Sequence, residues 1–446
     1  MTKRLLALAA AIVMLVTLFA ACGQKTGTEQ SAAPAGTESA AVATEAAQAQ
    51  EPAAPKIEGE IEFMTYRDDL LNTWWPAKFD EFKEKYPDVK ITTSTSKNYD
   101  QDFRVRLSSN DVPDVFTIMA DRYSDAQRSQ FMLPLNDVFP DMVNTWEYNG
   151  NNVNQEDQKT YGLTYGGQSI GLAYNKKIFA DLGLQPPKTL DEVIAAGKAI
   201  KAKGLIGFTG TFQPRWTMQP YYWTAQALLE NQTDTFNKMV QSDTPFTMDS
   251  PYGKMMEVLQ KLSKAGIMED DPASYNWEPY LKDAGSNKIG MAFTWTNTPC
   301  QWPGRGDGSM KLEDIGFVPF PYDNSGGPYK ALVQADWSVC IAKNSDNPEA
   351  AKAFFAFHMN DIYGDYAKET AILSAKQGFV TDVPYLKEFD AAKPVMVNAE
   401  KYPNDFRTRM DKAQINLDDP YVEVGVGVEI QKVLDKLNTA WKKAKN

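Results

Sequence analysis

The chain has 446 residues, 43% of them hydrophobic and 23% charged, which is enough for two domains and a sizeable core. Its 58 acidic and 46 basic side chains give a net charge of -12, so a protein that neutralises a nucleic-acid backbone is not expected. One histidine, His358, and three cysteines leave too few ligands for a His and Cys zinc site, a haem pair or a histidine-based triad. We therefore expect no metal and no cofactor. The 10 Trp and 20 Tyr residues form an aromatic surplus that a functional hypothesis has to explain.

The N-terminal segment has the features of a secretion signal. Lys3 and Arg4 precede an apolar run over residues 5–21, and the run ends in small residues before Cys22. This ending resembles a bacterial lipobox, which implies that residues 1–21 are a signal peptide and that Cys22 is lipidated. The protein is then expected on the extracytoplasmic face of the cell membrane. An uncleaved membrane anchor is the alternative.

Residues 22–56 are predicted to be a disordered tether, because Ala, Thr, Glu, Gln, Gly, Ser and Pro dominate this stretch and it contains no aromatic residue. With Cys22 lipidated, Cys300 and Cys340 remain. An oxidising exterior permits a disulfide between them, and two separate buried thiols are the alternative.

From residue 57 the sequence alternates short apolar strands with amphipathic helices. A strand is predicted over 61–66, a helix over 75–86, a strand over 89–93, a helix from 101 and a strand over 114–119. Further strands are predicted over 170–174, 205–209, 289–294, 315–320 and 337–341, with helices over 189–203, 255–265 and 347–359. This alternation is typical of doubly wound α/β sheets, which bind ligands beyond the carboxyl ends of their strands. The loops after Tyr66 and Met119 are therefore the first candidate sites.

Several of these segments together resemble a known family. The run from Tyr161 to Val193 (YGLTYGGQSIGLAYNKKIFADLGLQPPKTLDEV), PDVFTIMAD from Pro113 and NKIGMAFTW from Asn287 are similar to the extracellular solute-binding proteins of ABC importers, of the sugar-binding, maltose-binding-protein-like kind. VPFPYDNSGG from Val318 and IAKNSDNPEAAKAFFAF from Ile341 add to the likeness, which extends over nearly all of the chain from residue 57.

The resemblance implies an α/β, two-lobed periplasmic-binding-protein-like fold of type II, with doubly wound sheets joined by a hinge. One lobe is expected over 57–167 plus 319–374, and the other over 168–318 plus 375–446. It also implies a monomer that delivers its solute to ABC permease subunits. Energy for transport comes from a separate ATPase, since the sequence has no GxxxxGK[ST] phosphate loop.

Candidate ligand-binding residues follow from the chemistry of saccharides, which present hydroxyl groups around the ring and apolar CH faces above and below it. Aromatic side chains suit the faces, and carboxylates, amides or Arg suit the hydroxyls. Asp121 and Arg122 match a ligand-contacting Asp-Arg of the maltose-binding protein. Asp68 and its neighbour Asp69 have helix capping as their alternative role. The predicted ligand-binding residues are Asp68, Asp121, Arg122, Tyr165, Trp216, Trp223, Trp295, Asp336 and Trp337.

Other aromatic residues are expected in the core. Trp75 shares a helical face with Phe79 and Phe82, and His358 lies on an apolar helix, so packing explains both. About half of the candidate Trp and Tyr residues are expected to pack in the core and not to bind ligand.

Two further functions stay open at this point. Paired carboxylates, for which Glu269 to Asp271 is the most acidic run, would suit a secreted glycoside-active enzyme. A binder of a peptide, polyol or phosphodiester would use the same fold. Clustered Trp favours a sugar and the acidic body disfavours large anions. We therefore predict a lipid-anchored binder of an oligosaccharide with no catalytic residue.

Overall fold

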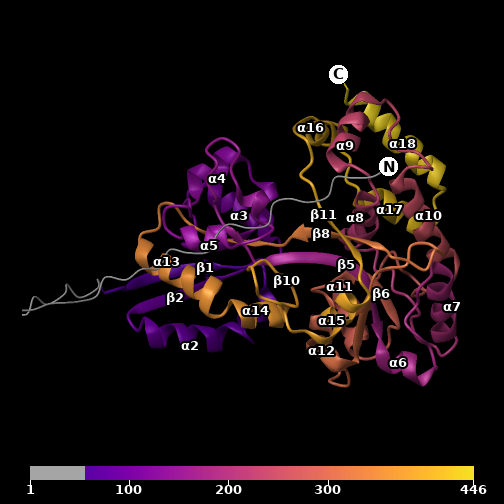
Figure 1. Ribbon diagram of the computed structural model, residues 1–446, viewed down its shortest axis with the longest axis horizontal. Coiled ribbons are helices and arrows are strands. Elements are labelled where there is room, and N and C mark those ends of the chain that lie inside the picture. Colours follow the sequence, from indigo (N-terminus) through magenta and orange to yellow (C-terminus); the bar gives the residue numbers. More distant parts are fainter. Residues whose placement is uncertain (1–55, 446) are drawn as a thin grey trace, which may run out of the picture. The chain divides into compact units, whose positions relative to one another are not determined.

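Two β-sheets, each covered by helices, make up residues 56–445, the part of the chain that this computed structural model describes (Figure 1). The predicted signal peptide 1–21, the lipidation site Cys22 and all but the last residue of the predicted tether 22–56 lie outside the described residues. Within residues 56–445, no helix has the length and apolar character needed to cross a membrane. The predicted α/β class is confirmed.

The first sheet has the strand order β2-β1-β3-β9-β4. Its strands are β1 (Gly59–Met64), β2 (Val89–Ser94), β3 (Val115–Ile118), β9 (Ser338–Ile341) and β4 (Leu163–Thr164). β1 runs parallel to β2 and β3, while β9 is antiparallel to both β3 and β4. Every residue of β3 and β9 is buried, as expected for strands covered on both faces. These strands confirm the four predicted in this part of the chain.

Two hydrophobic clusters form the core around the first sheet, and seven helices contribute residues to them. These helices are α1 (Asp68–Leu71), α2 (Trp75–Lys85), α3 (Tyr99–Ser108), α4 (Asp125–Phe131), α5 (Pro140–Asn144), α13 (Pro348–Ala356) and α14 (Tyr363–Thr370). Trp75 is fully buried and lies edge-on to Phe63 and to His358, so its predicted packing role is confirmed. Burial lowers the pKa of His358 to about 3, which keeps the imidazole neutral. The histidine therefore belongs to the core.

The second sheet is built around one long strand, β5 (Gly166–Asn175). Antiparallel to it lie β6 (Met291–Trp295), β7 (Ile315–Val318), β8 (Lys330–Ala335) and β10 (Leu373–Ser374), and β11 (Val395–Asn398) runs parallel to β8. β5 is nearly continuously buried because it carries neighbours along its whole length.

The strand predicted over 205–209 is wrong. Only an isolated bridge between Ile206 and Ile289 forms there. The N–H of Phe208 donates to the Ile267 carbonyl, whereas the next N–H, of Thr209, donates to the Met291 carbonyl. Since consecutive residues bond to different neighbours, no continuous ladder develops.

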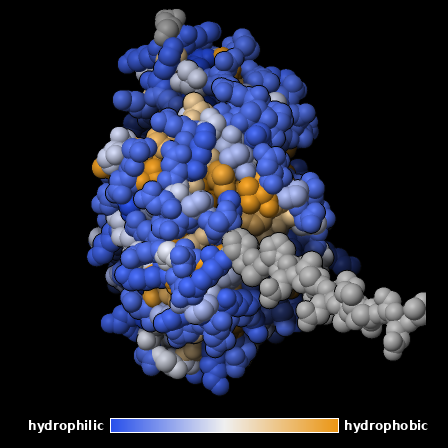
Figure 2. All heavy atoms as spheres, turned by 90° about the vertical axis from the view of Figure 1, so that its left-hand side faces the viewer, coloured by the Kyte–Doolittle hydropathy of each residue, from blue (hydrophilic) through white to orange (hydrophobic). Residues whose placement is uncertain are grey.

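The second sheet's helices are α6 (Lys176–Asp181), α7 (Leu190–Lys201), α8 (Gln219–Ala227), α9 (Gln232–Gln241), α10 (Pro251–Lys264), α11 (Trp277–Gly285), α12 (Trp302–Arg305), α15 (Pro384–Ala391), α16 (Asn404–Ala413), α17 (Asp418–Gly425) and α18 (Ile430–Lys443). Thr189 caps α7 by accepting the Glu192 N–H at 3.2 Å. The face shown in Figure 2 is mostly hydrophilic with small hydrophobic areas, in keeping with the acidic composition.

The chain passes between the two sheets at short connections. β4 and β5 are separated only by Tyr165, and β8 and β9 only by Asp336 and Trp337. The expected first-lobe segment 319–374 therefore needs a correction, because β8, at 330–335, pairs with β5 in the second sheet. We propose Asp336 as the crossing point in place of residue 319.

Cys300 and Cys340 are both free thiols, which favours two separate thiols over a disulfide between them.

Candidate functional site

A cavity of about 1020 Å³ lies where the two sheets meet. The first sheet contributes residues that follow β1 and β3, and the second contributes the ends of β5, β6 and β8. Its lining includes Tyr66, Asp121, Arg122, Tyr148, Asn151, Gln168, Trp216, Tyr222, Trp223, Trp277, Trp295, Asn297, Gln301, Asp336, Trp337, Glu400, Lys401, Tyr402 and Arg407. Such a space is large enough for a ligand of several rings, since small-molecule sites occupy about 300–1,000 Å³.

One wall of the cavity is a stacked pair, Tyr66 on Trp337, with ring centroids 4.2 Å apart and planes 8° from parallel. Tyr66 lies two residues after β1, and Trp337 directly precedes β9. Tyr99 supports the pair edge-on at 5.4 Å from Trp337, and the Arg122 guanidinium lies 5.9 Å from the Trp337 ring. We refer to Tyr66 and Trp337 as the first wall.

The opposite wall consists of indoles from the second sheet's region. Trp216 lies 4.7 Å from Trp277 and 5.4 Å from Trp295 between ring centroids, and Trp223 meets Trp295 edge-on at 6.0 Å. Trp216 is 37% exposed, whereas Trp295 is 5% exposed and belongs to the hydrophobic core. We refer to Trp216, Trp277 and Trp295 as the second wall.

A buried carboxylate lies beside the first wall. Asp336 is 3% exposed; its Oδ1 accepts a hydrogen bond from Gln168 Nε2 at 2.7 Å, and its Oδ2 has no partner in the protein. Burial raises the pKa of Asp336 to about 6, while its hydrogen bonds and the nearby Arg67 oppose the rise. A buried oxygen without a partner is costly, so a ligand hydroxyl donating to Oδ2 would relieve that cost.

A second polar contact bridges the cavity. Arg407 of α16 donates from Nη1 to the Asp121 carbonyl at 2.8 Å, and its Nη2 lies 4.0 Å from Asp121 Oδ2. Arg122 instead pairs with Asp100 at 2.6 Å. The Arg407 contact therefore joins a helix near the second sheet to the loop after β3.

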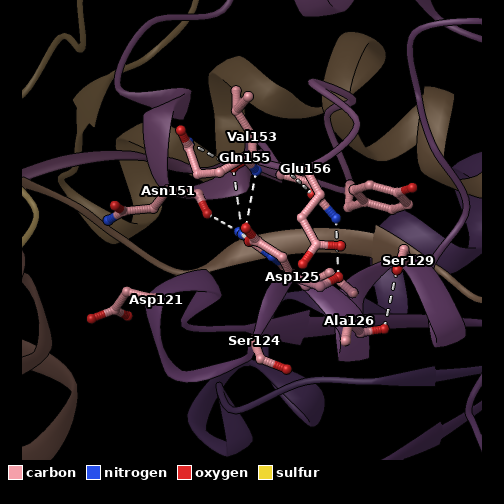
Figure 3. Close-up of polar contacts among 12 residues, drawn as sticks. Asp121, Ser124, Asp125, Ala126, Ser129, Asn151, Val153, Gln155 and Glu156 are labelled. Carbon is pink, nitrogen blue, oxygen red and sulfur yellow. Dashed lines mark hydrogen bonds and ion pairs between the residues drawn. The ribbon is translucent and has the colours of Figure 1, made fainter. Parts of the chain in front are cut away.

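The loop next to Asp121 is held by its own cluster of hydrogen bonds (Figure 3). The buried Arg128 side chain binds the Asn151 carbonyl and the Asp125 carboxylate, and the Gln155 N–H donates to Asp125 Oδ2 at 3.0 Å. Asp121 and Asn151 point to the same side, away from this cluster, and both line the cavity. The cluster thereby fixes the loop from which Asn151 faces the cavity.

Most of the predicted ligand-binding residues come together in this cavity. Its lining contains Asp121, Arg122, Trp216, Trp223, Trp295, Asp336 and Trp337. Their contact with a ligand stays a prediction.

Two predicted residues lie elsewhere. Asp68 is exposed in the first turn of α1, with no side-chain cap bond and no place in the cavity lining. Tyr165 is fully buried and stacks on Tyr366 at 4.2 Å, because the crossing between β4 and β5 turns its ring into the first sheet's core. Neither residue belongs to the cavity lining, so the structure does not support the predicted ligand contacts of Asp68 and Tyr165.

Sequence reasoning missed several lining residues. Trp277 begins α11 and follows no predicted strand, so the rule that ligands bind at strand ends did not point to it. Tyr148, Gln168, Asn297 and Gln301 have no motif either, since a lone amide or phenol suits the surface, a turn or a site equally. The rule that strand ends face ligands could have found Gln168 once β5 was recognised.

No candidate metal site appears within residues 56–445, where no three His, Cys, Asp or Glu side chains gather closely enough to hold an ion. The acidic run Glu269 to Asp271 does not line the cavity. Glu269 accepts backbone N–H groups of residues 210 and 211, Asp270 pairs with Lys201, and Asp271 accepts the Ser274 hydroxyl. The acidic run therefore contributes no carboxylate to the cavity.

Comparison with known proteins gives a consistent result. The family model described as bacterial extracellular solute-binding protein matches residues 68–361. The melibiose/raffinose/stachyose-binding protein of Bacillus subtilis is 23% identical over 71% of this chain and 74% of its own length. The diacetylchitobiose-binding protein of Streptomyces coelicolor is 22% identical over 76% and 80%.

Solved structures share the fold. A binding protein of an ABC transporter from Bifidobacterium animalis subsp. lactis, in complex with mannobiose, has a TM-score of 0.72 at 23% identity over 87% of this chain and 95% of that chain. A sugar transporter protein from Bacillus licheniformis in complex with stachyose has a TM-score of 0.64 at 20% identity over 86% and 100%. The predicted two-lobed, type II periplasmic-binding-protein-like fold is confirmed.

Proposed function

The chain belongs to the bacterial extracellular solute-binding proteins, and from this membership we propose that it binds an oligosaccharide in the cavity between the two sheets and delivers it to an ABC permease. The observation that carries the proposal is the pair of aromatic walls on opposite sides of one cavity of about 1020 Å³. Named relatives that bind melibiose, raffinose, stachyose or diacetylchitobiose support a carbohydrate as the ligand.

The cavity suits sugar rings in particular. Flat rings on the two walls offer surfaces for apolar CH faces, at about 25 cal/mol for each Å² of apolar surface removed from water. Charged lining residues balance closely, because Asp121, Glu147, Asp336 and Glu400 face Arg122, Lys401 and Arg407. An almost neutral set of charges with many amides favours a neutral, hydroxyl-rich solute over a peptide terminus or a phosphodiester.

The ligand-binding residues that we propose are Trp337 and Tyr66 as one platform, Trp216 and Trp277 as the other, and Asp336 as an acceptor of a ligand hydroxyl. Trp295 and Trp223 support the second platform from the core side. Asp121 and Arg122 complete the polar rim. The chain is proposed to act as a binder without a covalent step.

We propose further that Cys22 carries a lipid anchor and that the chain acts as a monomer at the extracytoplasmic face of the membrane. The resemblance of the Cys22 segment to a lipobox supports the anchor. Two or more acyl chains hold a protein at a membrane durably, at about 0.8 kcal/mol for each buried CH₂. Metabolic labelling with a palmitate analogue tests the anchor, and loss of the label in Cys22→Ala is the expected result.

Thermal unfolding in the presence of candidate ligands tests the function. A ligand that binds only the native state stabilises it by RT ln(1 + [L]/Kd). We expect a rise in Tm with at least one of mannotriose, raffinose, stachyose or diacetylchitobiose, followed by calorimetry for Kd. A rise with a peptide, polyol or phosphodiester and with no sugar would contradict the proposed ligand, and hydrolysis of a chromogenic glycoside would contradict the proposed absence of catalysis.

A further inference from the structure

Glu269 lies between α10 and α11 and outside the cavity lining, with 8% of its surface exposed. Its carboxylate accepts the Gly210 N–H at 3.0 Å from each oxygen and the Thr211 N–H at 2.6 Å from Oε1. Burial raises the pKa of the Glu269 carboxyl, and the bonds from residues 211 and 210 oppose that rise. The buried carboxylate thus holds a segment, residues 209–215, that forms neither helix nor strand and that leads into a 3-10 helix at Trp216–Met218.

The loop concerned, residues 209–217, contains two strained positions. Thr211 has φ 49° and Arg215 has φ 58°, and non-glycine residues adopt such angles at a cost of about 1–3 kcal/mol. Bonds inside the loop offset part of this cost: the Thr209 and Thr211 hydroxyls lie 2.6 Å apart, and the Thr217 hydroxyl donates to the Thr211 carbonyl. The remaining support comes from outside the loop.

This loop carries the most exposed indole of the second wall. Trp216 directly follows the strained Arg215 and leans on Trp277 and Trp295. The Phe212 N–H also donates to the Pro272 carbonyl at 2.9 Å and the Gln213 N–H to the Tyr275 carbonyl at 3.4 Å, so the loop bonds at several points to the segment that leads into α11 and Trp277. Glu269 therefore links the backbone at residues 210 and 211, which precedes Trp216, to the segment that leads to Trp277.

We infer that Glu269 is a positioning residue for carbohydrate binding: it holds loop 209–217 in the strained form that places the Trp216 indole at the cavity. The inference rests on the proposed function, because it assigns Trp216 to a ligand platform. In Glu269→Gln one of the two acceptor oxygens becomes an amide NH2, a donor that faces the backbone N–H groups of residues 210 and 211, so the loop loosens and the indole loses its fixed orientation.

Asp114 provides a matched control. Its Oδ2 accepts the Glu62 N–H at 2.8 Å in the first sheet, and it does not line the cavity. Asp114→Asn and Glu269→Gln therefore make the same chemical change to a carboxylate that accepts a backbone N–H, and only the second lies under a cavity wall.

The experiment measures Kd by calorimetry for whichever of mannotriose, raffinose or stachyose binds the wild-type protein most tightly. Glu269→Gln should weaken binding about fourfold, less than the loss expected when the Trp216 indole is removed, while Asp114→Asn should stay within about 1.5-fold of wild type. The decisive comparison is a double-mutant cycle with Trp216→Ala. Once the indole is absent, adding Glu269→Gln should change Kd by less than about twofold, because both changes remove the same platform.

Two results overturn the inference. Either Glu269→Gln binds as tightly as wild type, or it weakens binding by the same factor with and without Trp216. Failure of the proposed function is distinguishable, since the wild-type protein would then bind none of the sugars, and the inference would fail with it. Should Glu269→Gln not fold, as judged by circular dichroism, Glu269→Asp keeps the charge but shortens the side chain by one methylene, which draws the carboxylate away from residues 210 and 211 and should weaken binding about threefold; wild-type affinity in that variant overturns the inference.

Discussion

The two walls of the cavity are both aromatic, yet they are fixed in different ways. Tyr66 and Trp337 lie within two residues of β1 and β9, so the register of the first sheet sets their stacking at 4.2 Å. Trp216 lies on loop 209–217, whose backbone needs positive φ angles at two non-glycine residues. A strand end provides a rigid platform at little extra cost, whereas a strained loop needs side-chain bonds from elsewhere in the chain.

This difference suggests a division of roles. We expect the first wall to be preformed in the free protein, and the second wall to depend on the bonds that hold its loop. Within the second wall, Trp295 is buried in the core and Trp216 is exposed, so truncation of Trp295 should destabilise the fold far more than truncation of Trp216.

The largest expected effect is on stability. Trp295→Ala should lower the free energy of unfolding by about 3–5 kcal/mol, because it empties a core position, whereas Trp216→Ala should lower it by less than about 1 kcal/mol. Urea denaturation monitored by circular dichroism measures both values. Equal losses in the two variants would contradict the assignment of Trp216 to the cavity surface.

Next in size is the contribution of the first wall to binding. Trp337→Ala should weaken oligosaccharide binding by about 2 kcal/mol, roughly thirtyfold in Kd, because a sugar face loses its apolar partner. Calorimetry measures the change. Tyr86→Ala, an aromatic truncation next to the first sheet's core and outside the cavity lining, serves as the control and should leave Kd unchanged.

A pH effect of similar size is expected from Asp336, whose pKa is about 6 in the free protein. A hydroxyl donating to this carboxylate needs the ionised form, so at pH 5 binding should be about tenfold weaker than at pH 7.5. The stability of the free protein is expected to change with pH in the opposite direction to the affinity for the ligand. Because the native pKa is raised, this group's contribution is fully present below about pH 4 and is lost as the pH rises through 6.

Asp336→Asn tests that pH dependence. The variant should show nearly the same Kd at pH 5 and pH 7.5, as measured by fluorescence titration. A slope as steep as that of the wild-type protein would assign the pH dependence to another group.

A smaller loss is expected at the second wall. Trp216→Ala should weaken binding by about 1 kcal/mol, less than Trp337→Ala, because Trp277 remains to support a sugar ring. The ratio of the two Kd values at one temperature tests the comparison between the walls. A greater loss for Trp216 than for Trp337 would reverse the proposed roles.

The smallest effect should come from the contact that bridges the cavity. Arg407→Ala removes a half-exposed ion pair and one hydrogen bond to the Asp121 carbonyl, so binding should change by about 0.5–1 kcal/mol. Calorimetry again gives the value. Lys436→Ala, which removes the ion pair with Glu423 between α17 and α18, is the control and should have no effect on Kd.

Much of the fold could be predicted from the sequence, because strand and helix patterns depend on neighbouring residues. The runs that became β1, β3 and β9 bury consecutive apolar residues, and Thr189 and Glu192 have the spacing of a helix start. The run over 205–209 has the same composition and yet forms no strand, because its N–H groups bond alternately to two neighbours.

The residues of the candidate site also fall into two groups: those predictable from the local sequence and those that depend on contacts between distant residues. Asp121 lies three residues after β3, and Asp336 and Trp337 lie between β8 and β9, so the strand pattern was enough to predict that all three lie near strand ends. Only the tertiary structure decided that Tyr165 turns into the core while Tyr66 stacks on Trp337, that Asp68 faces solvent, and that Trp277 joins Trp216. The physical reason is range: local patterns fix the period of burial along an element, whereas the direction of a side chain at a crossing or in a loop depends on contacts between residues far apart in the chain.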